Sequence, residues 1–231
     1  MNPKNNSVNI VAFASGSGSN FKSIHNEIKI GKINAEIKLL VSNNPNAEVL
    51  SYANTEGIPM FIHNKNRFPG KIEFIDSLFS ELKNANANLL VLAGYMKKIP
   101  DEIVDHFERR IMNIHPSLLP KFGGKGFFGM NVHRAVIESN ENQSGASVHF
   151  VNKIYDDGPI LAQSSIEVKS GESPEELAKR VLIEEHKIYP EAIKAFCEKR
   201  ILWKNNKPRI LPLIHISEPT RRTPISYAVF C

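Results

Sequence analysis

Short apolar runs alternate along the chain with stretches in which apolar residues recur every three or four positions. The runs are typical of strands buried on both faces, and the recurring spacing is typical of amphipathic helices. This pattern predicts strands at residues 8–13, 36–41, 60–63, 89–93 and 110–113. It predicts helices at residues 20–30, 46–54, 71–83 and 101–107. Such alternation favours a doubly wound, mostly parallel, Rossmann-like α/β sheet with right-handed crossovers.

The second half of the chain follows a different pattern. Residues 147–151 and 160–167 predict two strands joined by a turn-rich segment, which would extend the sheet in antiparallel fashion. Ser173-Pro174-Glu175-Glu176 then predicts the start of a long C-terminal helix that runs to about residue 198. Ser is a good N-cap, Pro fits the first turn, and acids complement the positive end of the helix dipole.

We expect a single domain over residues 1–210. Residues 211–231 have no clear period and carry three prolines, LPLIHISEPTRRTPISYAVFC. We interpret this segment as an atypical tail, either artefactual or disordered, with a native extension or a partner-binding peptide as the alternative.

Composition excludes several classes of protein. The 231 residues are 42% hydrophobic, but no run approaches the ~20 apolar residues of a membrane span. Cys197 and Cys231 form neither a disulfide framework nor a metal-binding cluster, so we expect a reducing compartment and no metal. The N-terminus lacks the apolar region of a signal peptide, which predicts a cytoplasmic protein. The net charge of +5 is spread along the chain, which favours small anionic ligands over nucleic acid.

A glycine loop follows the first predicted strand, with Ser15-Gly16-Ser17-Gly18-Ser19-Asn20 leading into a helix. Glycines let the backbone approach a ligand, and a helix N-terminus favours a phosphate. Phe21 replaces the third glycine of the dinucleotide fingerprint, and no P-loop lysine follows. The loop is therefore either a site for one phosphate group or a tight turn capped by Ser19 or Asn20.

Two further stretches place polar side chains where ligands bind in open sheets. Asn113 ends a predicted strand and His115 follows in a proline-punctuated loop, at the carboxyl edge of the sheet. Asn donates hydrogen bonds to a developing oxyanion, and His donates one or carries a proton. Asp156 lies in a turn after a strand, where a carboxylate would orient the histidine. Both stretches also fit ordinary loops with satisfied backbone groups.

Glu185 falls within an apolar stripe of the last predicted helix when residues are placed about 100° apart. A carboxylate on a core-facing stripe costs free energy unless it is paired. It is either paired with a core partner or directed into a ligand cavity.

Taken together, the motifs SGSGSN, LAGYM, NIHPSLLPKF, GASVHFV, DDGPILAQ and EEHKIYP resemble those of the folate-dependent formyltransferases. The resemblance runs in order from about residue 8 to residue 203. The flanking motifs are most similar to the glycinamide ribonucleotide formyltransferases of purine synthesis. This implies formyl transfer from 10-formyltetrahydrofolate to the amine of glycinamide ribonucleotide, with no metal and no covalent enzyme intermediate, by a monomer or homodimer.

The resemblance also implies roles for individual residues. Asn113, His115 and Asp156 match the catalytic triplet, in which Asn113 and a protonated His115 stabilise the oxyanion. Asp156 aligns with the catalytic aspartate of the family when the alignment is fixed at the Gly158-Pro159 pair. It would orient His115 and help to move the proton. The residues matching ribonucleotide contacts are Gly18, Ser19, Asn20 and Glu185. The residues matching folate contacts are Met96, Lys97, Lys98, Ile99, Val151, Asn152 and Tyr155.

Two departures from the family pattern stand out. The segment 121–131, KFGGKGFFGMN, is longer and richer in glycine than in many members, as expected of a mobile lid near the substrate. Lys97 and Lys98 also stand where the family often has one basic and one apolar residue.

Three alternative functions remain. A methionyl-tRNA formyltransferase would carry a further C-terminal domain, and a formyltetrahydrofolate deformylase would carry an N-terminal domain and a residue other than Pro116 after His115. A non-catalytic nucleotide-binding module would bind phosphate without turnover and would leave the triplet unexplained.

Overall fold

A computed structural model describes residues 7–212 of the chain. Its main sheet has the strand order β3-β2-β1-β4-β5-β6-β7. Neighbours from β3 to β5 are parallel, whereas β5-β6 and β6-β7 are antiparallel. The expected doubly wound sheet with an antiparallel extension is therefore confirmed. The strands are β1 (Val8–Phe13), β2 (Ala35–Ser42), β3 (Met60–Ile62), β4 (Leu89–Leu92), β5 (Ile111–His115), β6 (Gln143–Phe150) and β7 (Ile160–Glu167).

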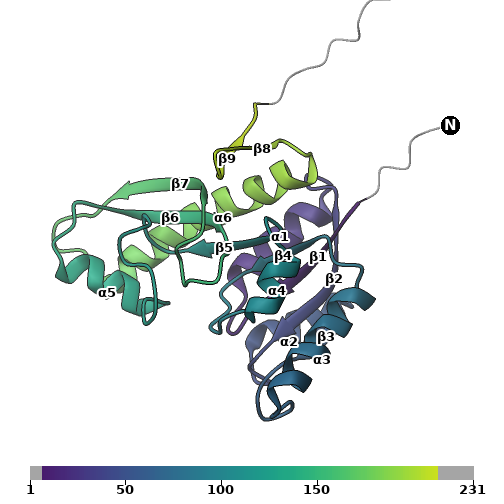
Figure 1. Cartoon of the computed structure of the whole chain (residues 1–231). Helices are drawn as coiled ribbons and strands as arrows, with labels where there is room; N and C mark the ends of the chain where they lie inside the picture. The colour runs from purple at the N-terminus through teal and green to yellow at the C-terminus, as the bar shows by residue number, and fades with distance from the viewer. Residues whose placement is uncertain (1–6, 213–231) are drawn as a thin grey trace, which may run out of the picture.

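Helices cover both faces of this sheet, as Figure 1 shows. One hydrophobic cluster joins the sheet to α1, α2, α5 and α6, and a second joins it to α3 and α4. The helices are α1 (Ser19–Lys29), α2 (Glu48–Thr55), α3 (Lys71–Asn84), α4 (Asp101–His106), α5 (Met130–Glu138) and α6 (Pro174–Cys197). Within residues 7–212, every helix is too short or too polar to cross a lipid bilayer.

The long helix α6 is fixed at its start and near its middle. Ser173 and Glu176 form a reciprocal capping box, as the sequence predicts. The buried hydroxyl of Tyr189 lies 3.1 Å from the carbonyl oxygen of Leu92 and 2.9 Å from that of Met112. Because this hydroxyl contacts both β4 and β5, it holds α6 beneath the strands that carry the central polar residues.

Strand β5 is longer than the sequence pattern indicates. The predicted strand ends at Asn113, but β5 continues to His115, which pairs with Ser147 of β6. The antiparallel partner supplies hydrogen bonds that a strand pattern read alone does not reveal. His115 is therefore held on a strand, and the prediction that it lies in a loop is wrong.

Two further elements were not predicted from the sequence. Helix α5 buries Val132, His133 and Val136 within nine residues, too short a pattern to distinguish from the preceding loop. A separate hairpin joins β8 (Ile201–Lys204) to β9 (Lys207–Ile210). The predicted domain boundary coincides with the end of β9 and stays a prediction, and residues 213–231 of the predicted tail lie outside the described residues.

Candidate active site

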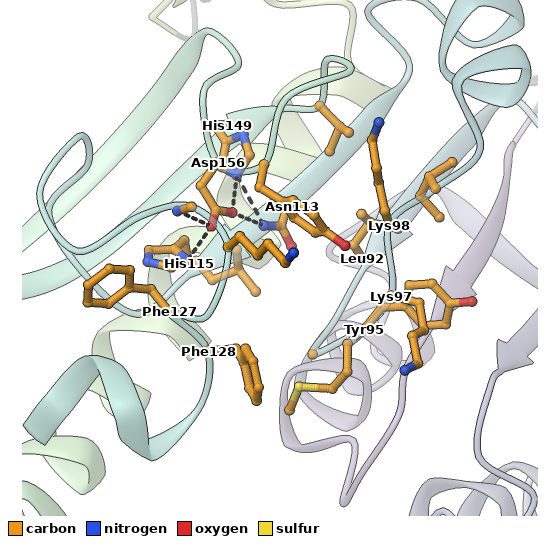
Figure 2. A pocket seen from close by; sticks show the side chains of 18 of the residues that line it. Leu92, Tyr95, Lys97, Lys98, Asn113, His115, Phe127, Phe128, His149 and Asp156 are labelled. Atoms are coloured by element: carbon orange, nitrogen blue, oxygen red, sulfur yellow. Dashed lines mark hydrogen bonds and ion pairs between the residues drawn. The ribbon is translucent and has the colours of Figure 1, made fainter.

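A cavity of about 210 Å³ opens beside the ends of β4, β5 and β6. Its walls combine the segment 94–99 after β4, the segment 124–129 and the loop after β6. Figure 2 shows Asn113, His115 and His149 directed toward Asp156 at one side of this cavity. The arrangement follows from topology, because β5 and β6 run antiparallel and place Asn113 directly opposite His149.

Asp156 is the centre of a compact group of polar contacts. Its Oδ1 lies 3.4 Å from the side-chain nitrogen of Asn113 and 3.6 Å from Nε2 of His149. Its Oδ2 accepts a hydrogen bond of 2.9 Å from the main-chain N–H of Gly124 and lies 3.5 Å from Nδ1 of His115. The carboxylate thus joins two strands to the glycine-rich segment.

His115 is 3% exposed and has an acceptor near each ring nitrogen. Its Nε2 lies 2.7 Å from the carbonyl oxygen of Phe122, and its Nδ1 faces Asp156. A carbonyl oxygen only accepts, so Nε2 carries a proton in this geometry. A second proton on Nδ1 would then be donated directly to the carboxylate.

Burial and nearby charges act in opposite directions on the pKa values of His115 and Asp156. Burial lowers the pKa of His115 below its ordinary value, although the Asp156 charge and the Phe122 carbonyl act to raise it. Burial alone would raise the pKa of Asp156, but the contacts with His115 and the Gly124 N–H help to hold it below its ordinary value. Asp156 is therefore ionised near neutral pH, and His115 needs additional negative charge nearby to hold two protons.

Ten of the residues singled out from the sequence line this one cavity. The three residues of the expected catalytic triplet all line it, so the fold brings them together in space. Every residue expected to contact folate also lines it, namely Met96, Lys97, Lys98, Ile99, Val151, Asn152 and Tyr155.

The residues expected to contact the ribonucleotide lie outside this lining. Gly18 has φ +70° and caps α1, whose first turn begins at Ser19. Asn20 and Glu185 are 7% and 8% exposed, and the Asn20 amide donates a 2.5 Å hydrogen bond to the Glu185 carboxylate. Burial raises the pKa of Glu185 to about 7, against the opposing effect of Asn20. The carboxylate on the apolar stripe therefore has a polar partner on another helix.

One part of the site, His149, was not identified from the sequence, whereas the segment 121–131 was expected to lie near the substrate. His149 lies in the quoted GASVHFV motif, but its role becomes visible only when β6 is paired with Asn113. The segment 124–129 lines the cavity, and Gly124 binds Asp156. The mobility expected of a lid there stays a prediction. Within the described residues, no group of three or more His, Cys, Asp or Glu side chains forms a candidate metal site.

Comparison with known proteins agrees with this arrangement. The formyl transferase family matches residues 8–193. Phosphoribosylglycinamide formyltransferase of Arabidopsis thaliana, a chloroplastic protein, is 46% identical over 198 residues, which cover 85% of this chain and 68% of that protein. The Escherichia coli protein of the same name is 34% identical over 199 residues, covering 86% of this chain and 92% of its own.

Solved structures give the same result. Glycinamide ribonucleotide transformylase 1 of Symbiobacterium toebii superposes with a TM-score of 0.83 at 33% identity, covering 91% of this chain and 96% of its own. A formyltetrahydrofolate deformylase of Pseudomonas syringae has a TM-score of 0.80 at 21% identity, which shows a shared fold alone. With the family match spanning most of its length, the chain belongs to the formyl transferase family.

Proposed function

We propose that this protein transfers the formyl group of 10-formyltetrahydrofolate to the amine of glycinamide ribonucleotide. The observation that carries the proposal is the convergence of Asn113, His115 and Asp156 at the side of one cavity. Relatives at 34–46% identity that bear the name phosphoribosylglycinamide formyltransferase support the same reaction. The products would be formylglycinamide ribonucleotide and tetrahydrofolate.

The cavity wall suits a reduced folate. Met96, Ile99 and Val151 offer apolar surface, while Lys97 and Lys98 place cations beside it. A partly apolar ring system with a carboxylate-bearing tail would match such a lining. The formyl group would then lie next to Asn113 and His115.

The ribonucleotide phosphate would bind at the start of α1. The first turn of a helix has N–H groups without helical partners, and the helix dipole attracts an anion. Gly18 and Ser19 are placed there, at the end of the glycine loop. Because the Asn20 amide is already bound to Glu185, we expect main-chain N–H groups of this turn to provide most of the phosphate contacts.

In the proposed reaction, the substrate amine attacks the formyl carbon and the carbonyl oxygen becomes an oxyanion. One side-chain N–H of Asn113, released from its 3.4 Å contact with Asp156, would stabilise that oxygen. The Nε2 proton of His115, released from the Phe122 carbonyl, would donate to the same oxygen while Nδ1 stays on Asp156. Collapse of the intermediate breaks the bond to the folate nitrogen. The proton lost by the amine is delivered to that nitrogen, with Asp156 orienting His115 during the transfer.

The protonation of His115 would follow the chemistry. In the free enzyme, burial holds its pKa low despite the nearby Asp156 charge. A developing oxyanion adds a second negative charge, which favours the doubly protonated ring. We therefore expect His115 to bind its extra proton most strongly when the intermediate is present.

A formyl-transfer assay tests the proposal directly. Purified protein is incubated with 10-formyltetrahydrofolate and glycinamide ribonucleotide, and tetrahydrofolate and the formylated ribonucleotide are quantified together. We expect equal amounts of both products and little free formate. Formate release that is independent of the ribonucleotide would indicate hydrolysis instead, and no folate product from folded protein would overturn the proposal.

We expect a cytoplasmic protein that is a monomer or a homodimer. The names of the Arabidopsis and Vigna unguiculata relatives describe those proteins as chloroplastic. The cytoplasmic location therefore stays a prediction for this chain, and so does the monomeric or homodimeric state.

A further inference from the structure

Ser15 connects three loops through its own polar atoms. It follows β1, and it is 8% exposed. Its hydroxyl donates a 2.5 Å hydrogen bond to the side-chain oxygen of Asn43 and accepts one of 2.8 Å from the main-chain N–H of Met96. Its main-chain N–H donates to Gly94, and its carbonyl accepts from the side chain of Asn44. Each polar atom of this serine therefore forms a hydrogen bond with the loop that follows β2 or the loop that follows β4.

These contacts continue across the carboxyl edge of the sheet. The carbonyl of Asn43 accepts a 3.2 Å hydrogen bond from the side chain of Asn64, in the loop after β3. The loops after β3, β2, β1 and β4 are therefore joined in spatial order by side-chain hydrogen bonds. At one end of this row, Met96 lines the cavity, although Ser15 does not.

The Met96 contact is the one that reaches the cavity wall. Among the hydrogen bonds of residues 7–212, the Met96 N–H has Ser15 Oγ as its partner. A main-chain N–H that loses its partner in a part-buried place drives the local backbone to rearrange. The conformation of the segment 94–99 therefore depends on a hydroxyl that lies behind the wall.

We propose that Ser15 is a positioning residue for folate binding, whose hydroxyl holds the Met96 backbone and thereby shapes the cavity wall. This inference rests on the proposed function, since it assigns the wall to the folate. Ser15 makes no contact with substrate in this account. It acts through Met96, and Asn43 orients its hydroxyl so that a lone pair faces the Met96 N–H.

The test is the binding of tetrahydrofolate by calorimetry under reducing conditions. Ser15→Ala should raise the dissociation constant about tenfold, as expected when a part-buried N–H loses its acceptor. Asn43→Ala should weaken binding less, because the hydroxyl remains able to accept from Met96. In the formyl-transfer assay, Ser15→Ala should raise KM for the folate while leaving kcat and KM for the ribonucleotide within about twofold.

Ser42→Ala is the matched control. It removes a fully buried hydroxyl from a neighbouring strand end. Within residues 7–212 this hydroxyl bonds to the backbone of Asn44, and Ser42 does not line the cavity. The thermal stability of this variant should fall without a change in tetrahydrofolate affinity. Ser15→Cys keeps a weaker acceptor and should bind tetrahydrofolate with intermediate affinity. It replaces Ser15→Ala in the test if the alanine variant does not fold.

The outcomes separate the inference from the proposed function. Wild-type protein that does not bind tetrahydrofolate overturns both. Wild-type binding that is matched by Ser15→Ala, or by Ser15→Cys where the alanine variant does not fold, overturns the inference alone. An equal loss of affinity in Ser42→Ala would show a general packing effect and also overturns it.

Discussion

The side-chain nitrogen of Asn113 lies 3.0 Å from Nε2 of His149, across the antiparallel pair β5-β6. An amide nitrogen donates and does not accept, so Nε2 is the acceptor in this contact. The other nitrogen, Nδ1, lies 3.0 Å from the carbonyl oxygen of Phe150 and donates to it. His149 therefore fixes which way the Asn113 amide faces, with its N–H groups directed by a neighbouring strand.

We predict that His149→Ala lowers kcat by about tenfold, because Asn113 loses the group that orients its amide. Asn113→Ala removes the proposed oxyanion donor itself and should cost about 10²–10³ in kcat. Steady-state kinetics with both substrates varied would measure each effect. In the double variant the two losses should not multiply, since both act through the same amide, and fully multiplicative losses would contradict this account.

His133 provides a test of how burial affects stability. It is 5% exposed, its Nδ1 is buried and has no hydrogen-bond partner within the described residues, and burial lowers its pKa to about 4. Below about pH 6.5 the unfolded chain binds a proton that the native protein does not, so stability should fall as the pH drops from 6.5 to 4. This one group contributes roughly 3 kcal/mol to that loss.

Urea unfolding between pH 4 and pH 7.5 measures the effect, with His133→Gln as the comparison. The difference in unfolding free energy between wild-type and His133→Gln protein should change across this window, because the glutamine does not titrate. A constant difference would show that His133 has an ordinary pKa in the folded state.

The contribution of Glu185 to stability should depend on pH in the opposite direction to that of His133. Its pKa is raised to about 7, so the native protein keeps a proton that the unfolded chain loses above about pH 4.5. The stability that this proton provides is complete below pH 4.5 and is lost as the pH rises through 7. We predict that Glu185→Gln is more stable than wild-type at pH 8, by about 2–3 kcal/mol, and is similar or less stable at pH 5.

The same variant tests the proposed substrate contact. If Glu185 contacts the ribonucleotide, Glu185→Gln should raise KM for that substrate and leave KM for the folate unchanged. Thermal melts at pH 5 and pH 8 and a kinetic comparison address the two effects separately. A stability difference that is independent of pH would refute the raised pKa.

Gly18 and Gly16 form a matched pair within the glycine loop. A Cβ at Gly18 would lie 2.2 Å from the Val49 side chain, and its φ of +70° disfavours other residues. A Cβ at Gly16 would have no atom within 4 Å. We predict that Gly18→Ala costs about 2–4 kcal/mol of stability, and that Gly16→Ala costs less than about 1 kcal/mol.

The kinetic consequence should follow the same order. Gly18→Ala displaces the start of α1, so KM for the ribonucleotide should rise, whereas Gly16→Ala should resemble wild-type. Chemical denaturation and initial rates provide the measurements. Equal stability and equal KM values in the two variants would mean that the contact with Val49 does not determine the conformation of the loop.

Much of the fold could be predicted because its strands are continuous apolar runs. β4 reads LLVL and is wholly buried, and the long periodic helix α6 begins at a recognisable capping box. The hydrophobic pattern did not predict elements whose extent depends on pairing with another strand. β5 extends to His115 because β6 pairs with it, and the β8-β9 hairpin turns on Asn205 and Asn206, whose positive φ values match a two-residue turn.

The candidate site was recovered only in part for the same reason. Asn113, His115 and Asp156 lie in recognisable motifs, but His149 gains its role from a cross-strand register that no local pattern contains. The buried contact between Asn20 and Glu185 joins residues on two helices. Helical periodicity identified the unusual carboxylate, yet its partner required the folded chain.

Asp156 adopts φ +52°, a left-handed conformation that Asp and Asn tolerate better than most residues. Replacing it by alanine or a β-branched residue would therefore combine a chemical loss with a backbone penalty. Asn would keep both the side-chain shape and the turn while removing the charge. Asp156→Asn is accordingly the variant of choice for an inert protein with which to capture both substrates bound together.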